Sequence, residues 1–105
     1  MNEAAQASLL ASEYGKRTIQ AFREVEDALV SIETYKEELV AQESRTTTAI
    51  GSEELAHVRY DEGSTTYLEV LEQQRQSFSA QLDLLSNRLN LLNSYIRLYK
   101  ALGGG

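Results

Sequence analysis

Glu54 and His57 come closest to a metal-binding or catalytic motif, because they form the pattern Glu-x-x-His. On a helix this spacing presents a carboxylate and an imidazole on one face, as in helical bundles that bind two metal ions. Such a site needs two of these motifs and a glutamate from each of two further helices. A dimer would supply them formally, but the motif lies in a polar stretch where an inward-facing ligand shell is not expected. We therefore predict no metal and no cofactor, and a seam or surface position for His57.

The remaining composition argues against enzymatic chemistry. The chain has no Cys and a single His, so it has no thiol nucleophile and no Cys-rich or His-rich zinc site. It shows no nucleophile–base pair and no phosphate-binding loop. The net charge of -6 argues against binding to nucleic acid. The chain is therefore not expected to be an enzyme, and no residue is a catalytic candidate.

The apolar segments are too short for a membrane span. The longest apolar runs cover only a few residues, whereas a bilayer-spanning helix needs about 20. No signal-peptide core follows Met1. We expect the sequence as given to be soluble or to be a piece of a larger protein.

The absence of Pro favours long, uninterrupted helices. In the second half an apolar residue recurs every three or four positions, interrupted only at Arg75, which is the pattern of a helix packed on helices. A second apolar row lies beside it at multiples of seven residues, so the apolar face is wide enough for more than one neighbouring helix. The first row is Leu71, Phe78, Leu82, Leu85, Leu89, Leu92, Ile96 and Tyr99, and the second is Val70, Leu84, Leu91 and Leu98.

The first half has the same spacing with more interruptions. Lys36 occupies one position of the row, and the pattern thins through residues 44–48. Gly51 follows, and a glycine inside a helix costs about 1 kcal/mol relative to alanine. Two interpretations stay open: one continuous helix, or a break near Gly51 with Ser52 capping a short third helix. The row itself consists of Phe22, Val25, Leu29, Ile32, Leu39, Leu55 and Val58.

A turn is indicated at Gly63, which is well placed to end a helix in the left-handed conformation. Three residues later, Thr66 and Glu69 have the spacing of a capping box that begins a helix. A stop and a start this close leave room only for a tight connection between antiparallel helices. We predict an all-α, antiparallel, coiled-coil-like hairpin across residues 1–105, with helices over about 4–62 and 66–101 and a turn at 63–65.

The two predicted helices differ in length. At equal rise, residue i of the first helix faces roughly residue 129 minus i, so the second helix reaches back only to about residue 26. Residues 2–25 then have no partner within the chain. Their apolar side chains must face another copy, a further part of a parent protein, or water, and we expect the chain to self-associate. At the other end, Arg97 and Lys100 suit a helix C-terminus, which Gly103, Gly104 and Gly105 end.

Three segments resemble the TolC-like outer-membrane efflux factors, in the order that the family shows. Residues 21–29 (AFREVEDAL) resemble a family signature. Residues 59–63 (RYDEG) and 67–72 (YLEVLE) resemble the periplasmic tip of the family's second helical hairpin. Residues 97–105 (RLYKALGGG) resemble the segment where the returning helix reaches the equatorial region. Together these matches cover about residues 20–105.

The resemblance implies a trimeric efflux channel, with a membrane-embedded part continued by an α-helical conduit in the periplasm. Small solutes leave through such channels, driven by an inner-membrane pump that is joined through a periplasmic adaptor protein. The chain would be the last hairpin of the helical conduit in a Gram-negative bacterium. It would contact the membrane only through parts absent from this sequence, and it would transport nothing by itself.

The resemblance also implies roles for individual residues. Leu68 would contribute to an apolar ring that constricts the closed entrance, and Glu69 and Glu72 fall where the family places gate carboxylates. Tyr60 matches a tyrosine that holds the closed state through hydrogen bonds. The tip that would meet the adaptor is Gly63, Ser64, Thr65 and Thr66.

Plainer interpretations of these residues stay open. Glu69 is also the expected capping-box partner, Glu72 a solvated helix residue, and Tyr60 an aromatic packed against Tyr67. Thr65 departs from family members that have Arg there, so an Arg-based latch is not expected, and Gly51 departs from an alanine-rich helix. The alternative function is a free-standing coiled-coil module that dimerises through its leucine face.

Overall fold

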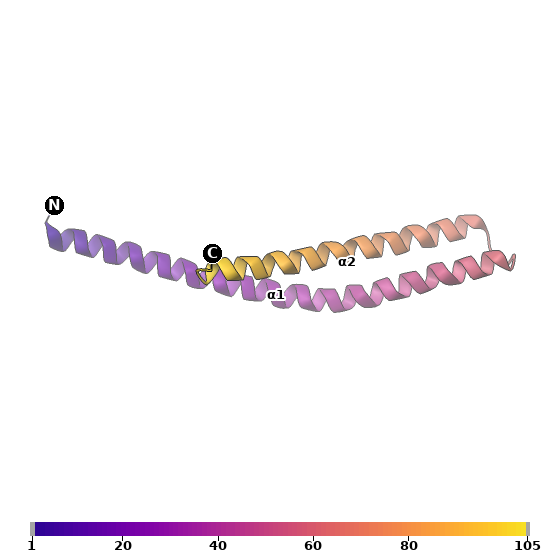
Figure 1. Ribbon diagram of the computed structural model, residues 1–105, viewed down its shortest axis with the longest axis horizontal. Coiled ribbons are helices and arrows are strands. Elements are labelled where there is room, and N and C mark those ends of the chain that lie inside the picture. Colours follow the sequence, from indigo (N-terminus) through magenta and orange to yellow (C-terminus); the bar gives the residue numbers. More distant parts are fainter. Residues whose placement is uncertain (1, 105) are drawn as a thin grey trace. The chain divides into compact units, whose positions relative to one another are not determined.

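The computed structural model describes residues 2–104 and contains two α-helices, α1 (Glu3–Asp61) and α2 (Tyr67–Ala101), shown in Figure 1. These bounds agree with the predicted ones to within one residue, so the predicted all-α hairpin is confirmed. α1 is continuous through Gly51. A break there is wrong, because it would forfeit several backbone hydrogen bonds and require a new helix nucleus, whereas the glycine costs only about 1 kcal/mol.

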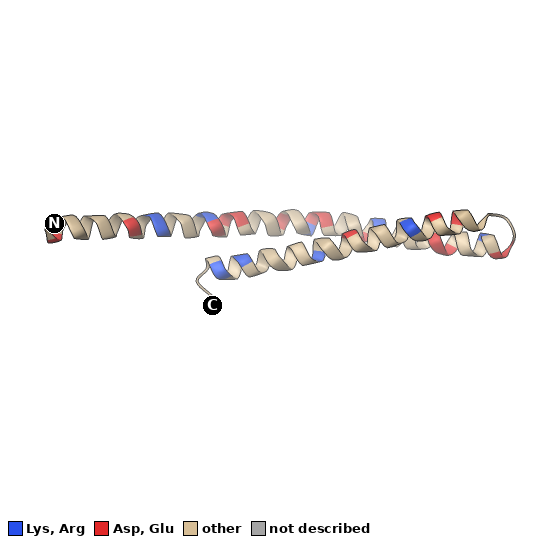
Figure 2. Ribbon diagram, turned by 90° about the horizontal axis from the view of Figure 1, so that it is seen from above, with Lys and Arg blue, Asp and Glu red and all other residues tan. Residues whose placement is uncertain are grey.

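The chain divides into two compact units. Unit 1 combines Met1–Glu33 with Leu92–Gly105, and unit 2 is Thr34–Leu91, which contains the turn. Within unit 2 the parts of α1 and α2 lie side by side and antiparallel (Figures 1 and 2). No helix in residues 2–104 has a stretch long and apolar enough to cross a bilayer.

Gly63 ends α1 as predicted. Its φ is +76°, the left-handed conformation that side chains with a Cβ disfavour. Its N–H donates to the Tyr60 carbonyl at 2.9 Å, and the Ser64 N–H donates to the Arg59 carbonyl at 2.8 Å. These two bonds form a Schellman motif, which satisfies carbonyls at the helix end and fixes the direction of the chain.

The end of α2 repeats this geometry. Gly103 has a φ of +85°, its N–H donates to the Lys100 carbonyl, and the Gly104 N–H donates to the Tyr99 carbonyl, both at 3.0 Å. The predicted stop is therefore confirmed for Gly103 and Gly104. Gly105 and Met1 lie outside the described residues.

The seam of unit 2 is not the row with the most regular leucines. The buried residues of α2 in this unit belong to the second predicted row and to small or polar positions between its members. Small side chains let two helix backbones approach closely, which leaves the larger leucines at the flank. The buried residues of this seam are Thr46 and Ala56 on α1 and Val70, Ser77, Ala80, Leu84 and Asn87 on α2.

The leucine row is largely exposed in both units. In unit 2 its members range from Leu71, at 44% exposed, to Phe78, at 64%. In unit 1, Ala28, Ile32 and Ser94 are buried, while the members of the row there remain exposed: Leu92, Ile96 and Tyr99. A neighbouring helix would be needed to cover this row, as its width predicts.

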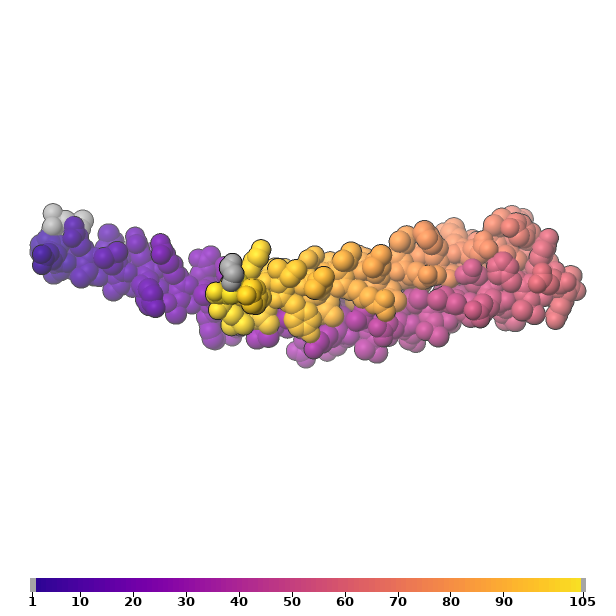
Figure 3. Space-filling view, in the orientation of Figure 1, coloured from indigo at the N-terminus to yellow at the C-terminus, as the bar shows by residue number. Residues whose placement is uncertain are grey.

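The first turns of α1 have no partner among the described residues of unit 1. On the face shown in Figure 3, no other segment lies against its first turns. Its large apolar side chains as far as Phe22 are more than half exposed, as the length arithmetic predicted. They are Leu9, Leu10, Tyr14, Ile19 and Phe22.

Candidate functional site

The first turn of α2 separates buried from exposed side chains at the tip of unit 2. Val70 is fully buried against α1, at 0% exposure. Leu68 is 77% exposed, so most of its side chain is open to solvent. An apolar side chain held this openly next to a rigid turn is available for contact with another molecule.

Tyr60 and Tyr67 face each other across the turn. Their ring centroids lie 5.3 Å apart with an angle of 55° between the ring planes. This tilted geometry suits two aromatic quadrupoles and joins the last turn of α1 to the first turn of α2. The predicted packing of Tyr60 against Tyr67 is confirmed. The hydrogen bonds that the resemblance implies for Tyr60 remain a prediction.

Glu69 has half of the predicted capping box. Its N–H donates to the Thr66 side-chain oxygen at 3.3 Å, which satisfies one free amide at the start of α2. Its carboxylate, however, accepts a hydrogen bond from Gln73 Nε2 at 3.0 Å, one turn further along. The carboxylate is exposed and has no cationic partner among the ion pairs of residues 2–104.

Glu72 is held by Arg75 in a two-pronged ion pair. Arg75 Nε donates to Oε2 at 3.1 Å and Nη2 donates to Oε1 at 2.7 Å, while Gln76 Nε2 donates to Oε1 at 3.1 Å. The hydrogen bonds from Arg75 and then Gln76 lower the pKa of Glu72 below its ordinary value. The same pair raises the pKa of Arg75.

The role of Arg75 was missed in the sequence, where it counts only as an interruption of the apolar row. The spacing of Glu72 and Arg75 could have predicted the pair, because residues three apart on a helix are neighbours and can form ion pairs. Acidic residues occur on both helices near the turn (Figure 2). Arg75 therefore offsets the negative charge of Glu72, one of the two candidate gate carboxylates. No ion pair within residues 2–104 offsets the charge of Glu69.

The tip itself is open to contact. Gly63, Ser64 and Thr66 are exposed, and Thr65 is half-buried. The Ser64 hydroxyl donates to the Arg59 carbonyl at 3.0 Å, which adds a third hydrogen bond to the turn. These residues form a short, fixed surface rather than a loose loop.

Both residues of the Glu-x-x-His motif are exposed. His57 Nε2 lies 3.2 Å from Gln74 Nε2 on α2, so the imidazole packs across the helix pair, and Glu54 is exposed. Residues 2–104 contain no group of three or more His, Cys, Asp or Glu side chains able to hold a metal ion.

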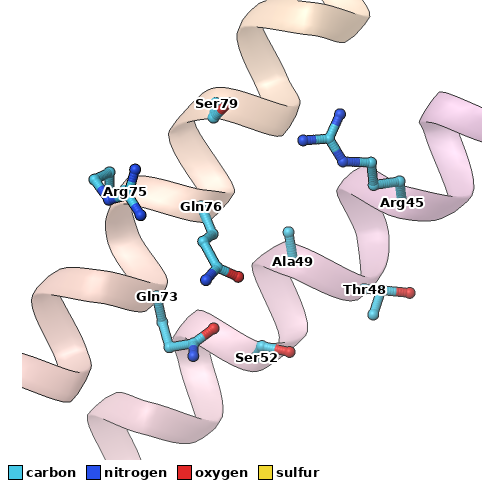
Figure 4. Close-up of a pocket in the computed structure, with 8 residues that line it drawn as sticks. All are labelled: Arg45, Thr48, Ala49, Ser52, Gln73, Arg75, Gln76 and Ser79. Carbon is cyan, nitrogen blue, oxygen red and sulfur yellow. The ribbon is translucent and has the colours of Figure 1, made fainter.

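A polar groove of about 420 Å³ lies between the helices of unit 2 (Figure 4). In Figure 4, Gln73 and Gln76 extend from α2 toward α1. The two arginines at its edge already have carboxylate partners, Asp83 for Arg45 and Glu72 for Arg75, so the groove is not a ready anion site. Its lining is Arg45, Thr48, Ala49, Ser52, Gln73, Arg75, Gln76 and Ser79.

Comparison with known proteins gives a consistent family. Residues 2–104 match the family described as "Outer membrane efflux protein". Over 94 residues the chain is 49% identical to the probable efflux pump outer membrane protein SepC and to the toluene efflux pump outer membrane protein TtgF, both of Pseudomonas putida. Each alignment covers 90% of this chain and 20% of the relative.

A more distant relative is named for a different cargo. The pyoverdine export outer membrane protein OpmQ of Pseudomonas aeruginosa is 38% identical over 92 residues, which cover 88% of this chain and 19% of the relative. The chain thus spans about a fifth of the length of these relatives. It belongs to the outer membrane efflux protein family, with a parent in the outer membrane and this helical segment in the periplasm.

Proposed function

We propose that the tip of unit 2 forms part of the gated periplasmic entrance of an efflux channel, built from three copies of the parent protein. The arrangement at the start of α2 carries this proposal. Val70 faces α1, whereas Leu68 and Glu69 are exposed on a turn that the Gly63 motif holds rigidly. Three such tips around one axis would place an apolar ring beside an acidic ring.

The charges at the tip define how such an entrance would act. Carboxylates repeated around a narrow mouth attract cations and repel one another when the mouth closes. Arg75 offsets much of the charge of Glu72, so in our proposal Glu69 carries more of the field at the mouth. Leu68 would close the path sterically, and Tyr60, packed on Tyr67, would hold the two helix ends together.

The tip residues Gly63 to Thr66 would dock the periplasmic adaptor, which in turn joins the inner-membrane pump. Their exposure and the three hydrogen bonds that fix the turn support this part of the proposal. A rigid surface loses little conformational entropy on binding, which favours docking.

The hairpin would pass small solutes without selecting them. Relatives at 49% and 38% identity are named for toluene efflux and for pyoverdine export. Since such different cargoes accompany similar hairpins, we assign cargo selection to other parts of the pump. The exposed leucine row would then be covered by neighbouring helices of the conduit.

Ion conductance through the full-length parent protein in planar bilayers tests the gate. Leu68→Ser should raise the conductance, since it removes an apolar constriction, whereas Leu85→Ser, 53% exposed and far from the tip, should not. Glu69→Gln should reduce the preference for cations more than Glu72→Gln does. Unchanged conductance in the Leu68 variant would remove that residue from the gate, and a larger effect at Glu72 would reverse the charge assignment.

A further inference from the structure

Residues 47–53 of α1 include a helical glycine and no buried side chain. No residue of α1 between Thr46 and Ala56 is buried. Gly51 lies in the middle of this stretch, and a Cβ built on it would meet nothing within 4 Å. An exposed helical glycine adds backbone freedom without any packing that would offset it.

Two grooves have residues of this stretch in their walls. The groove of Figure 4 has Thr48, Ala49 and Ser52 as its α1 wall. A second groove, also about 420 Å³, has Glu53 as its contribution from α1. Low packing around a helix segment lowers the free energy of opening it locally.

Two threonines, just before and at the start of this stretch, make hydrogen bonds that compete with the helical ladder. The hydroxyl of Thr46 donates to the Gln42 carbonyl at 2.7 Å, and that of Thr47 donates to the Glu43 carbonyl at 3.0 Å. Such bonds to the carbonyl four residues back compete with the helical ladder and often bend helices.

Polar contacts hold the chain firmly on the side away from the tip. Arg45 pairs with Asp83 at 2.8 Å, and the Thr46 hydroxyl also reaches the Ala80 carbonyl at 3.3 Å. Asn87 donates to the Tyr35 carbonyl at 3.1 Å. We call these contacts the polar clamp.

Other contacts hold the tip side. There His57 meets Gln74, and Tyr60 meets Tyr67. Between the two regions, no side chain of residues 47–56 makes a hydrogen bond to α2 in the part of the chain that is described. The loosely held stretch is therefore bounded on both sides by cross-helix contacts.

We propose that residues 47–53 are a built-in point of flexure, at which the tip of unit 2 moves relative to the polar clamp. The inference concerns α1 itself and stands independently of any gate. In this proposal Gly51 provides flexibility at a helical position where alanine would give a more stable helix.

Residue-resolved amide hydrogen exchange on the whole chain tests this proposal. Amides of residues 50–56 should exchange about ten-fold faster than those of residues 39–46, because local opening is easier there. Gly51→Ala should slow exchange at residues 50–56 by about five-fold, as the helix propensities predict. Gly15→Ala is the matched control, since Gly15 is also a helical glycine with open space around it. This control should leave residues 50–56 unchanged.

A distance measurement distinguishes bending of α1 from local opening that leaves the direction of the helix unchanged. Spin labels at Glu38 and Glu62, both exposed and on either side of the stretch, should give a broad distance distribution that narrows in Gly51→Ala. Equal exchange across residues 39–56, or a distribution of the same width in both proteins, would overturn the proposal.

Discussion

Arg75 donates two hydrogen bonds, 3.1 and 2.7 Å long, to the carboxylate of Glu72, which lies three residues earlier on the same helix. This relationship changes the meaning of the two carboxylates near the turn. Arg75 on the same helix offsets much of the charge of Glu72, whereas the exposed carboxylate of Glu69 has Gln73 as its one side-chain donor within residues 2–104. Similar residues one turn apart thus offer different electrostatics to a neighbour.

Arg75→Gln should raise the pKa of Glu72 toward its ordinary value, because the largest cause of its lowering is removed. A lowered pKa means that the ion pair supports the fold above the ordinary pKa and that this support is lost as pH falls through the lowered one. Carboxyl chemical shifts followed by NMR through the acidic range measure this change. Arg59→Gln serves as the control and should leave the pKa of Glu72 where it is. If Glu72 titrated identically in the Arg75 variant, the ion pair between Arg75 and Glu72 would not persist in solution.

Val70→Ala should destabilise the chain by about 2 kcal/mol, since Val70 is fully buried in the seam of unit 2. Leu85→Ala removes a larger side chain but should cost less, because Leu85 is 53% exposed. Urea unfolding of both variants, at a concentration where the chain is monomeric, compares the two costs. If the Leu85 variant were the less stable, the leucine row would be the true seam.

Gly63→Ala should destabilise the chain by about 1 kcal/mol, because alanine must adopt a φ of +76° there. Gly51→Ala should instead stabilise it by a similar amount, since Gly51 is helical and unhindered. The two variants make the same chemical change with opposite expected signs. Thermal unfolding followed by circular dichroism measures both, and a shift in the same direction would contradict the conformations described here.

Much of the fold could be predicted from the sequence because its signals are local. Gly63 marks a helix end through its own backbone freedom, and Thr66 marks the next start through one side chain. The absence of Pro and the apolar spacing then fix the two helices between these signals. The predicted packing of Tyr60 on Tyr67 also follows from their positions on either side of a tight turn.

The choice of seam could not be predicted because it depends on small and polar residues. Ser77 and Asn87 are buried, yet they add nothing to an apolar periodicity, so the leucine row dominated the pattern. The pairing of Arg75 with Glu72 was hidden for a similar reason. An arginine in an apolar row is recorded as an interruption, and only the side-chain geometry shows which acid it meets.

The chain should self-associate in solution through its exposed apolar surfaces. The leucine row of α2 and the unpartnered first turns of α1 leave large side chains open to water, and covering them is favourable at about 25 cal/mol per Å². Light scattering across micromolar concentrations should therefore show oligomers. Leu82→Glu and Leu89→Glu together should shift the equilibrium toward monomer, because they place charge in the row. The matched pair Glu38→Gln and Glu62→Gln, on exposed polar positions, should leave it unchanged. A stable monomer of the unmodified chain at all these concentrations would show that the exposed row is not sufficient for association.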